Sequence, residues 1–141
     1  MNRYFSYADV AAHRAHIFTA IVVLFVSFLT LSCGTRSNDI SPNLTWQELV
    51  QQAQNATDRN EYKKAEIYYN TILERFPFDN EAVCGARYEI AFIHYKQKKW
   101  DQSRSEFLTL LERYEGVDSE LLPEKYKILS NIVLKKIEPH I

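Results

Sequence analysis

One segment of this chain occurs twice, and the repetition constrains the fold more than any other feature. Residues 60–79 read NEYKKAEIYYNTILERFPFD, and residues 98–116 read KKWDQSRSEFLTLLERYEG. When Tyr62 is aligned with Trp100, Tyr69 falls on Phe107 and the run LERF falls on LERY, which gives a period of 38 residues. Repeats of this length are typical of stacked helix pairs, in which each pair buries its apolar side against the next.

Composition agrees with an all-helical protein. Only three Gly and four Pro occur among 141 residues, and apolar residues alternate with charged helix formers. The formal net charge is −1, without the clustered basic excess that a nucleic-acid-binding surface needs. The sequence therefore favours a small helical domain that does not bind nucleic acid.

The N-terminal segment has the features of an export signal. Residues 1–16 carry Arg3 and Arg14, and residues 17–32 contain no charged side chain. Sixteen helical residues span about 24 Å, which is shorter than the roughly 30 Å hydrocarbon core of a bilayer. We therefore expect residues 1–32 to be a signal peptide, in which a positively charged N-terminal region precedes a short apolar helix.

A cysteine follows this apolar run directly. The sequence LTLSCG, which ends in Cys33 and Gly34, resembles the lipobox of bacterial lipoproteins, although Thr30 stands where leucine is usual. The resemblance implies cleavage after Ser32 and covalent lipid on the Cys33 thiol; two or three acyl chains anchor a protein durably. The alternative is an uncleaved anchor with an incidental cysteine. If Cys33 is lipidated, Cys84 has no partner for a disulfide and is expected to be a small buried side chain.

The rest of the chain divides into a tether and a helical domain. Residues 33–44 are mostly polar and are expected to be flexible. The domain, residues 45–141, begins with Thr45 and Glu48, which form a capping box, and Leu44 and Leu49 are spaced for a hydrophobic staple. Pro77 and Gly116 mark helix ends, and Pro123 suits the first turn of a helix. We expect helices over residues 46–57, 61–76, 81–97, 101–114 and 123–137, the third apolar on nearly all sides.

The two helix-turn-helix units resemble the tetratricopeptide repeat. The resemblance rests on small residues at helix crossings, aromatic residues in the second helix and a proline after it. In the first unit it is carried by Ala53, Ala56, Tyr62, Ala65, Tyr69, Ile72 and Pro77, and in the second by Ala91, His94, Trp100, Ser103, Phe107 and Leu110. It implies an all-α fold, namely a short helical solenoid of two repeats plus a C-terminal helix.

A narrower resemblance is to the outer-membrane assembly lipoproteins of the BamD (YfiO) type. It rests on the corner ERFPF, residues 74–78, on a following helix that ends in Tyr95 and Lys96, and on the lipobox at Cys33. It implies a lipid-anchored adaptor on the periplasmic face of the outer membrane. The expected partners are the barrel-assembly protein or unfolded outer-membrane proteins. That family has more repeats than this chain, so the functions of its C-terminal repeats do not carry over.

Candidate binding residues follow from the repeat pattern, since stacked helix pairs bind through the first helix of each unit. The third predicted helix places three aromatic residues and a lysine on one face. They form either a surface for a peptide segment or the core beneath the last helix. The predicted partner-binding residues are Tyr88, Phe92, Tyr95, Lys96, Lys127 and Asn131.

Catalytic and metal-binding motifs are not found. His94 and His140 lie 46 residues apart without a second ligand at metal spacing, and His94 occupies a repeat packing position. We expect no enzyme and no cofactor apart from the lipid on Cys33. Two other functions stay open: a repeat scaffold of another envelope complex, and a ligand-delivery lipoprotein, which would need an enclosed pocket. The apolar last helix also suggests that this end pairs with a partner protein or with another copy of the chain, as a homodimer.

Overall fold

The computed structural model describes residues 40–141, which contain five α-helices and no strand. The helices are α2 (Trp46–Asp58), α3 (Tyr62–Arg75), α4 (Asn80–Lys96), α5 (Trp100–Glu112) and α6 (Glu124–Ile137). Short 3₁₀ helices occupy Arg113–Glu115, Ser119–Leu121 and Glu138–His140. The predicted all-α class is confirmed for this part of the chain. The predicted signal peptide, the lipidation site Cys33 and most of the tether lie outside the described residues.

The start of α2 follows the expected capping box. The Thr45 hydroxyl accepts a hydrogen bond from the Glu48 backbone N–H at 3.3 Å, and the Thr45 backbone N–H donates to the Glu48 carboxylate at 2.8 Å. These bonds satisfy two backbone N–H groups that a helix start otherwise leaves unpaired. The Thr45 backbone N–H and hydroxyl both donate to the Glu48 carboxylate, and these two bonds lower the pKa of Glu48. Asp79 caps α4, since its carboxylate accepts from the Ala82 backbone N–H at 2.9 Å.

The 38-residue period is present in the backbone. Helices α3 and α5 begin at Tyr62 and Trp100, and the residues two positions earlier, Asn60 and Lys98, have φ angles of 59° and 60°. These two are the non-glycine residues with positive φ in the described part of the chain. The same left-handed turn therefore connects α2 to α3 and α4 to α5, and each connection produces a helix hairpin.

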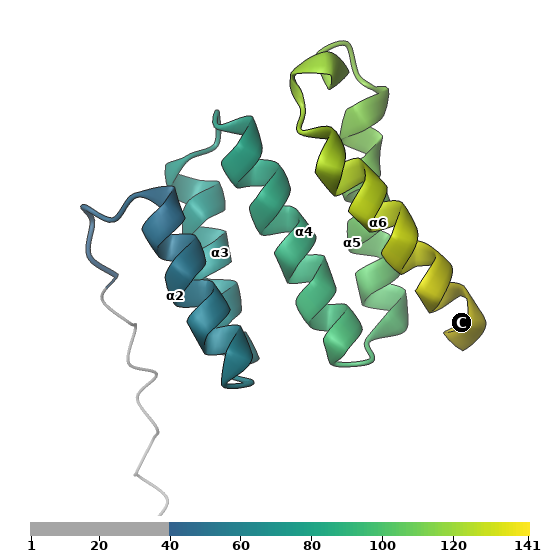
Figure 1. The fold of residues 1–141 in the computed structure, drawn as a ribbon, viewed down its shortest axis with the longest axis horizontal. Helices are drawn as coiled ribbons and strands as arrows, with labels where there is room; N and C mark the ends of the chain where they lie inside the picture. The colour runs from purple at the N-terminus through teal and green to yellow at the C-terminus, as the bar shows by residue number, and fades with distance from the viewer. Residues whose placement is uncertain (1–39) are drawn as a thin grey trace, which may run out of the picture. The chain divides into compact units, whose positions relative to one another are not determined.

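The helices form two layers, with α2, α4 and α6 in front and α3 and α5 behind them (Figure 1). We call the surface formed by α2, α4 and α6 the first-helix face. Helix α4 packs against all four other helices, in agreement with its apolar sequence. Equivalent positions of the two hairpins are fully buried, namely Ala65 and Ser103, Tyr69 and Phe107, and Ile72 and Leu110.

Helix ends differ from the prediction by one or two residues, and the largest change follows α5. The chain tightens into a 3₁₀ turn at Arg113–Glu115 before Gly116 instead of continuing as α-helix. Tyr114 is buried there, and its hydroxyl donates to the Pro123 carbonyl at 2.9 Å. That bond fixes the connection to α6, whose outer side leaves Ile128 and Ile132 about half exposed. Within residues 40–141, no helix is long and apolar enough to cross a membrane.

Candidate functional site

Six aromatic rings form a continuous row across α4, the start of α5, the start of α6 and the C-terminal 3₁₀ helix. Consecutive ring centroids lie 4.4–5.9 Å apart. Contacts of this kind stabilise by about 0.5–1.5 kcal/mol each beyond the area that they bury. We call this row the aromatic ladder; in order it contains Tyr126, Tyr88, Phe92, Tyr95, Trp100 and His140.

The ladder lies partly in the core and partly at the surface. Tyr88 is buried and also contacts Phe107, whereas Phe92, Tyr95 and Trp100 are partly exposed and pack against the same core. The sequence left open whether these aromatic residues form a binding surface or the core beneath the last helix. The structure divides them between the two. Tyr88 belongs to the core beneath α6, and Phe92 and Tyr95 present ring edges or faces on the first-helix face.

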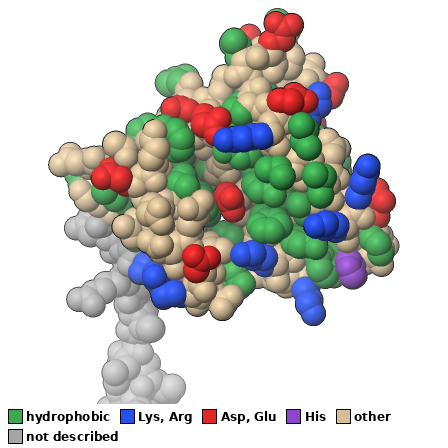
Figure 2. All heavy atoms as spheres, in the orientation of Figure 1, with side chains coloured by type: hydrophobic (Ala, Val, Ile, Leu, Met, Phe, Trp, Pro, Cys, Tyr) green, Lys and Arg blue, Asp and Glu red, His purple; other side chains and the backbone are tan. Residues whose placement is uncertain are grey.

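Lysine side chains border the exposed rings. The Lys96 ammonium lies 5.5 Å from the centre of the Phe92 ring, and the Lys125 ammonium lies 4.8 Å from that of Tyr126. Figure 2 shows the result as a hydrophobic surface over α4 and α6 with Lys and Arg side chains around it. An apolar centre with a charged rim is typical of protein-binding surfaces.

The other predicted binding residues lie on α6 and make separate contacts. Lys127 places its ammonium 5.9 Å from the Tyr114 ring. The Asn131 side chain donates to the Lys127 carbonyl at 2.9 Å and is exposed. The structure thus brings together Tyr88, Phe92, Tyr95 and Lys96, while Lys127 and Asn131 are not in the ladder.

A hollow on the same face contains residues that the sequence analysis did not select. It has a volume of about 80 Å³ and is lined by side chains from four helices. These include Trp46 and Gln54 of α2, Tyr69 of α3, Gly85 and Glu89 of α4, and Tyr126 of α6. Part of this site could have been found from the sequence. Glu81, Gly85 and Glu89 follow one another at four-residue spacing, so they must share one face of α4.

In the part of the chain that the structure describes, one of the two carboxylates that line this hollow has polar partners and the other has none. Glu81 forms an ion pair with Lys125 and accepts a hydrogen bond from the Tyr126 hydroxyl at 3.1 Å. Glu89 makes no hydrogen bond or ion pair within the described residues, and burial raises the pKa of its carboxyl, opposed in part by the charge of Lys96. Burial also raises the pKa of Tyr69 and of Tyr126.

His94 occupies a polar contact between three helices on the opposite side of α4. Its Nδ1 lies 2.6 Å from a Glu106 carboxylate oxygen of α5, and its Nε2 lies 3.5 Å from Glu66 of α3 and 3.3 Å from the Gln102 amide. His94 is therefore a buried side chain with polar partners, as its repeat packing position predicted. The described residues contain no group of three potential metal ligands.

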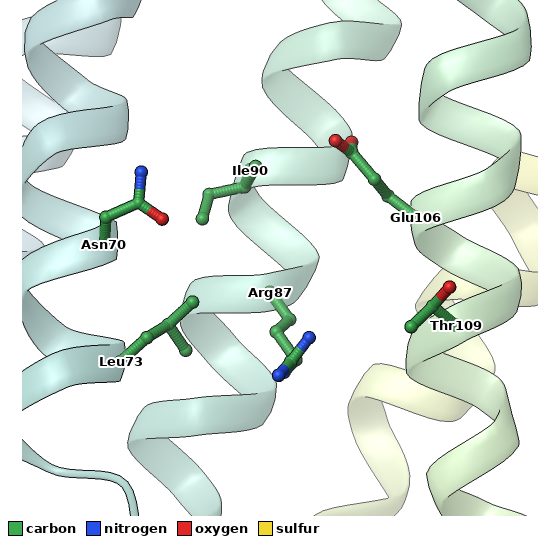
Figure 3. Close-up of a pocket in the computed structure, with 6 residues that line it drawn as sticks. All are labelled: Asn70, Leu73, Arg87, Ile90, Glu106 and Thr109. Atoms are coloured by element: carbon green, nitrogen blue, oxygen red, sulfur yellow. The ribbon is translucent and has the colours of Figure 1, made fainter.

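A second hollow of about 230 Å³ lies between α3, α4 and α5. Figure 3 shows Asn70 and Leu73 on one side and Glu106 and Thr109 on the other, with Arg87 and Ile90 of α4 between them. Glu106 is already bound to His94 and Gln102. This hollow is therefore a gap between neighbouring helices, and its carboxylate, that of Glu106, already has two partners within the protein.

Comparison with known proteins gives one relative without an assigned function. No protein-family model and no solved structure matches the chain significantly. An uncharacterized protein of Treponema pallidum (strain Nichols) is 35% identical over 123 residues, which are 86% of this chain and 49% of the relative. The chain thus spans about half the length of the curated relative that it matches.

Proposed function

We propose that this protein is a lipid-anchored adaptor of the tetratricopeptide type, which binds a segment of a partner protein on its first-helix face. The observation that carries the proposal is the aromatic ladder, because partly exposed Phe92 and Tyr95 are bordered by lysines on that face. Aromatic side chains that are held in place by neighbouring rings bind a partner with little loss of conformational freedom. The 38-residue backbone repeat supports the repeat class.

Within this class, we propose a BamD-like subunit of the machinery that assembles outer-membrane β-barrel proteins. The support is the resemblance at the corner of residues 74–78 and at the Tyr95–Lys96 pair. In the fold, this corner connects α3 to α4, and the Phe78 ring at its tip is 96% exposed. An apolar ring in that position is available for a partner contact, as a docking corner requires.

Membrane attachment in this proposal depends on lipid at Cys33. The anchor places the protein on the periplasmic face of the outer membrane, and residues 33–44 connect it to α2. The adaptor works without a catalytic step or a further cofactor, because its function is to hold a partner at the membrane.

Of the two other functions, only ligand delivery is weaker by physical argument. A ligand-delivery lipoprotein needs a mostly apolar site that encloses its ligand. The larger hollows in the described residues, about 230 and 380 Å³, are lined by several charged and polar side chains. A scaffold for cell-wall or division proteins would use the same first-helix face, so only the identity of the partner separates it from the leading proposal.

The test is a crosslinked pull-down of the tagged, lipidated full chain from native membranes. Phe92→Ala and Tyr95→Ala should reduce recovery of the outer-membrane barrel-assembly protein several-fold, whereas Ile67→Ala on α3 should not. Ile67 is a matched control because it is 44% exposed and lies on the other layer of helices. Recovery of cell-wall or division proteins instead would favour the scaffold, and equal recovery with all variants would reject the ladder as the binding surface.

A further inference from the structure

The hollow between α2 and α4 differs from ordinary packing gaps, because two polar groups meet in it without partners. Figure 2 shows the first-helix face hollowed between these helices, with an acidic side chain in the hollow. The lining residue Glu89 has neither hydrogen bond nor ion pair within residues 40–141. A partly buried carboxylate normally has a counter-charge or several hydrogen-bond donors, since losing water is costly to the charged form.

Tyr69 is the second group. Its side chain is fully buried, it lines the same hollow, and its hydroxyl has no hydrogen-bond partner. Buried hydroxyl groups are usually paired, as that of Ser103 is with the Ala91 carbonyl at 2.8 Å. An unpaired hydroxyl in a lined hollow is available to a hydrogen-bonding group that enters from outside.

The internal repeat shows that packing alone does not require this hydroxyl. Tyr69 in α3 is equivalent to Phe107 in α5, and both rings are fully buried. Phenylalanine therefore satisfies the packing of this position in the second hairpin. The additional oxygen of Tyr69 adds a polar atom to the first hairpin, at the point where the hollow forms.

Gly85 and Tyr126 close one end of the hollow. A Cβ atom on Gly85 would lie 2.7 Å from the Tyr126 hydroxyl, so only glycine allows the ring to approach α4 this closely. Glycine in the middle of a helix costs about 0.5–1 kcal/mol relative to alanine. The close approach of Tyr126 explains why glycine is used here.

We propose that this hollow receives the cationic end of a lysine or arginine side chain, carried by the partner segment on the first-helix face. This inference rests on the proposed function. The N–H groups of an ammonium or guanidinium can donate to both Glu89 and the Tyr69 oxygen. Trp46 and Tyr126 provide aromatic walls of the kind that attract cations.

Other ligands fit the hollow less well. An anion would meet the carboxylates of Glu89 and Glu81, which repel it. A volume of about 80 Å³ holds the end of one side chain but is well below the roughly 300 Å³ of the smallest drug-sized sites. The hollow also lies beside the ladder, because Tyr126 lines the one and belongs to the other.

The experiment is a selection of random displayed peptides on the full chain in detergent, followed by fluorescence anisotropy with labelled peptides. Peptides selected on the wild-type protein should be enriched in Lys or Arg at one position. Replacing that residue by uncharged norleucine or citrulline should weaken binding about tenfold, the size expected for a hydrogen bond to a charged group. With Glu89→Gln the enrichment and the tenfold difference should disappear.

Two further variants make the result specific. Tyr69→Phe should reduce the preference for the basic peptide over its uncharged analogue several-fold. This variant should fold, because Phe107 occupies the equivalent site in the second hairpin. Glu112→Gln removes an exposed carboxylate of α5, in the other layer of helices, and should change nothing. Selected peptides that depend on Phe92 but show no basic preference, or an unchanged preference in Glu89→Gln, would overturn the inference and leave the proposed function standing. If no peptide is enriched above background, both the inference and the peptide-binding proposal are rejected.

Discussion

At the scale of single residues, the two left-handed turn positions are filled by unlike side chains. Asn60 and Lys98 have nearly the same φ, but asparagine tolerates this conformation better than lysine. We predict that Lys98→Asn raises the free energy of unfolding by about 0.5–1 kcal/mol. Urea denaturation followed by circular dichroism measures the change. Lys98→Ala is the control and should give no gain; equal stabilisation by both variants would assign the effect to loss of the lysine charge.

Glu89 predicts a pH dependence whose sign follows from burial. Its pKa is higher in the folded chain than the ordinary value of 4.5, so the folded state binds more protons than the unfolded state between these two values. Stability from this residue is therefore greatest below pH 4.5 and falls as the pH rises through the folded pKa.

We predict that Glu89→Gln is more stable than the wild type at neutral pH and that the difference vanishes below pH 4.5. Unfolding midpoints at several pH values provide the measurement. Glu48→Gln is a control for which the opposite change is expected. Hydrogen bonds from Thr45 lower the pKa of Glu48, so this variant should lose stability at neutral pH. A Glu89→Gln protein that is destabilised at neutral pH would show that Glu89 has a stabilising partner.

At the scale of elements, α4 organises the domain, because it packs against every other described helix. His94 ties its inner side to α3 and α5 through Glu66 and Glu106. We predict that His94→Leu lowers the free energy of unfolding by about 1–3 kcal/mol, the range for loss of a buried hydrogen bond to a charged group. His94→Gln, which keeps a donor, should lose less.

Urea midpoints of these variants should be compared with that of His140→Leu. His140 is exposed and stacks on Trp100, so its replacement should cost less than the loss at His94. If the urea unfolding midpoint of His94→Leu equals that of the wild type, the histidine fills space without stabilising the three-helix contact.

The elements were largely predictable because their signals are local. Thr45 and Glu48 specify a helix start within one turn, and the aligned turns at Asn60 and Lys98 repeat the same backbone geometry. Lys127 and Asn131 were selected by analogy between repeats. The contact of Lys127 with Tyr114 depends on how α6 packs against the 3₁₀ turn that follows α5, whereas Asn131 bonds to the Lys127 carbonyl within α6 itself. The hollow around Glu89 needs side chains from four helices, and no single helical pattern contains that information.

At the scale of the whole molecule, the first-helix face has two chemically different parts. The ladder has lysines around an apolar surface, whereas the hollow beside it has Glu81 and Glu89. A partner segment with a basic residue at one end and aromatic residues at the other would match both parts when bound in one of its two directions. Opposite charges at the two parts would disfavour a reversed segment, so the surface can select direction as well as composition.

In the proposed function, the attachment of this face to a membrane depends on the Cys33 thiol, and the chain supplies its own control because it contains two cysteines. Cys84 is a fully buried free thiol in the core of the helical domain, where acylating enzymes cannot reach it. We predict that Cys33→Ser abolishes incorporation of an alkyne-labelled fatty acid in bacterial cells and transfers the protein from the membrane fraction to the soluble or unprocessed pool. Cys84→Ala should keep the label and the membrane fraction, with some loss of stability from the smaller side chain. Label that persists in Cys33→Ser would contradict the lipoprotein proposal, and an unlabelled wild type that stays in the membrane would favour an uncleaved apolar anchor.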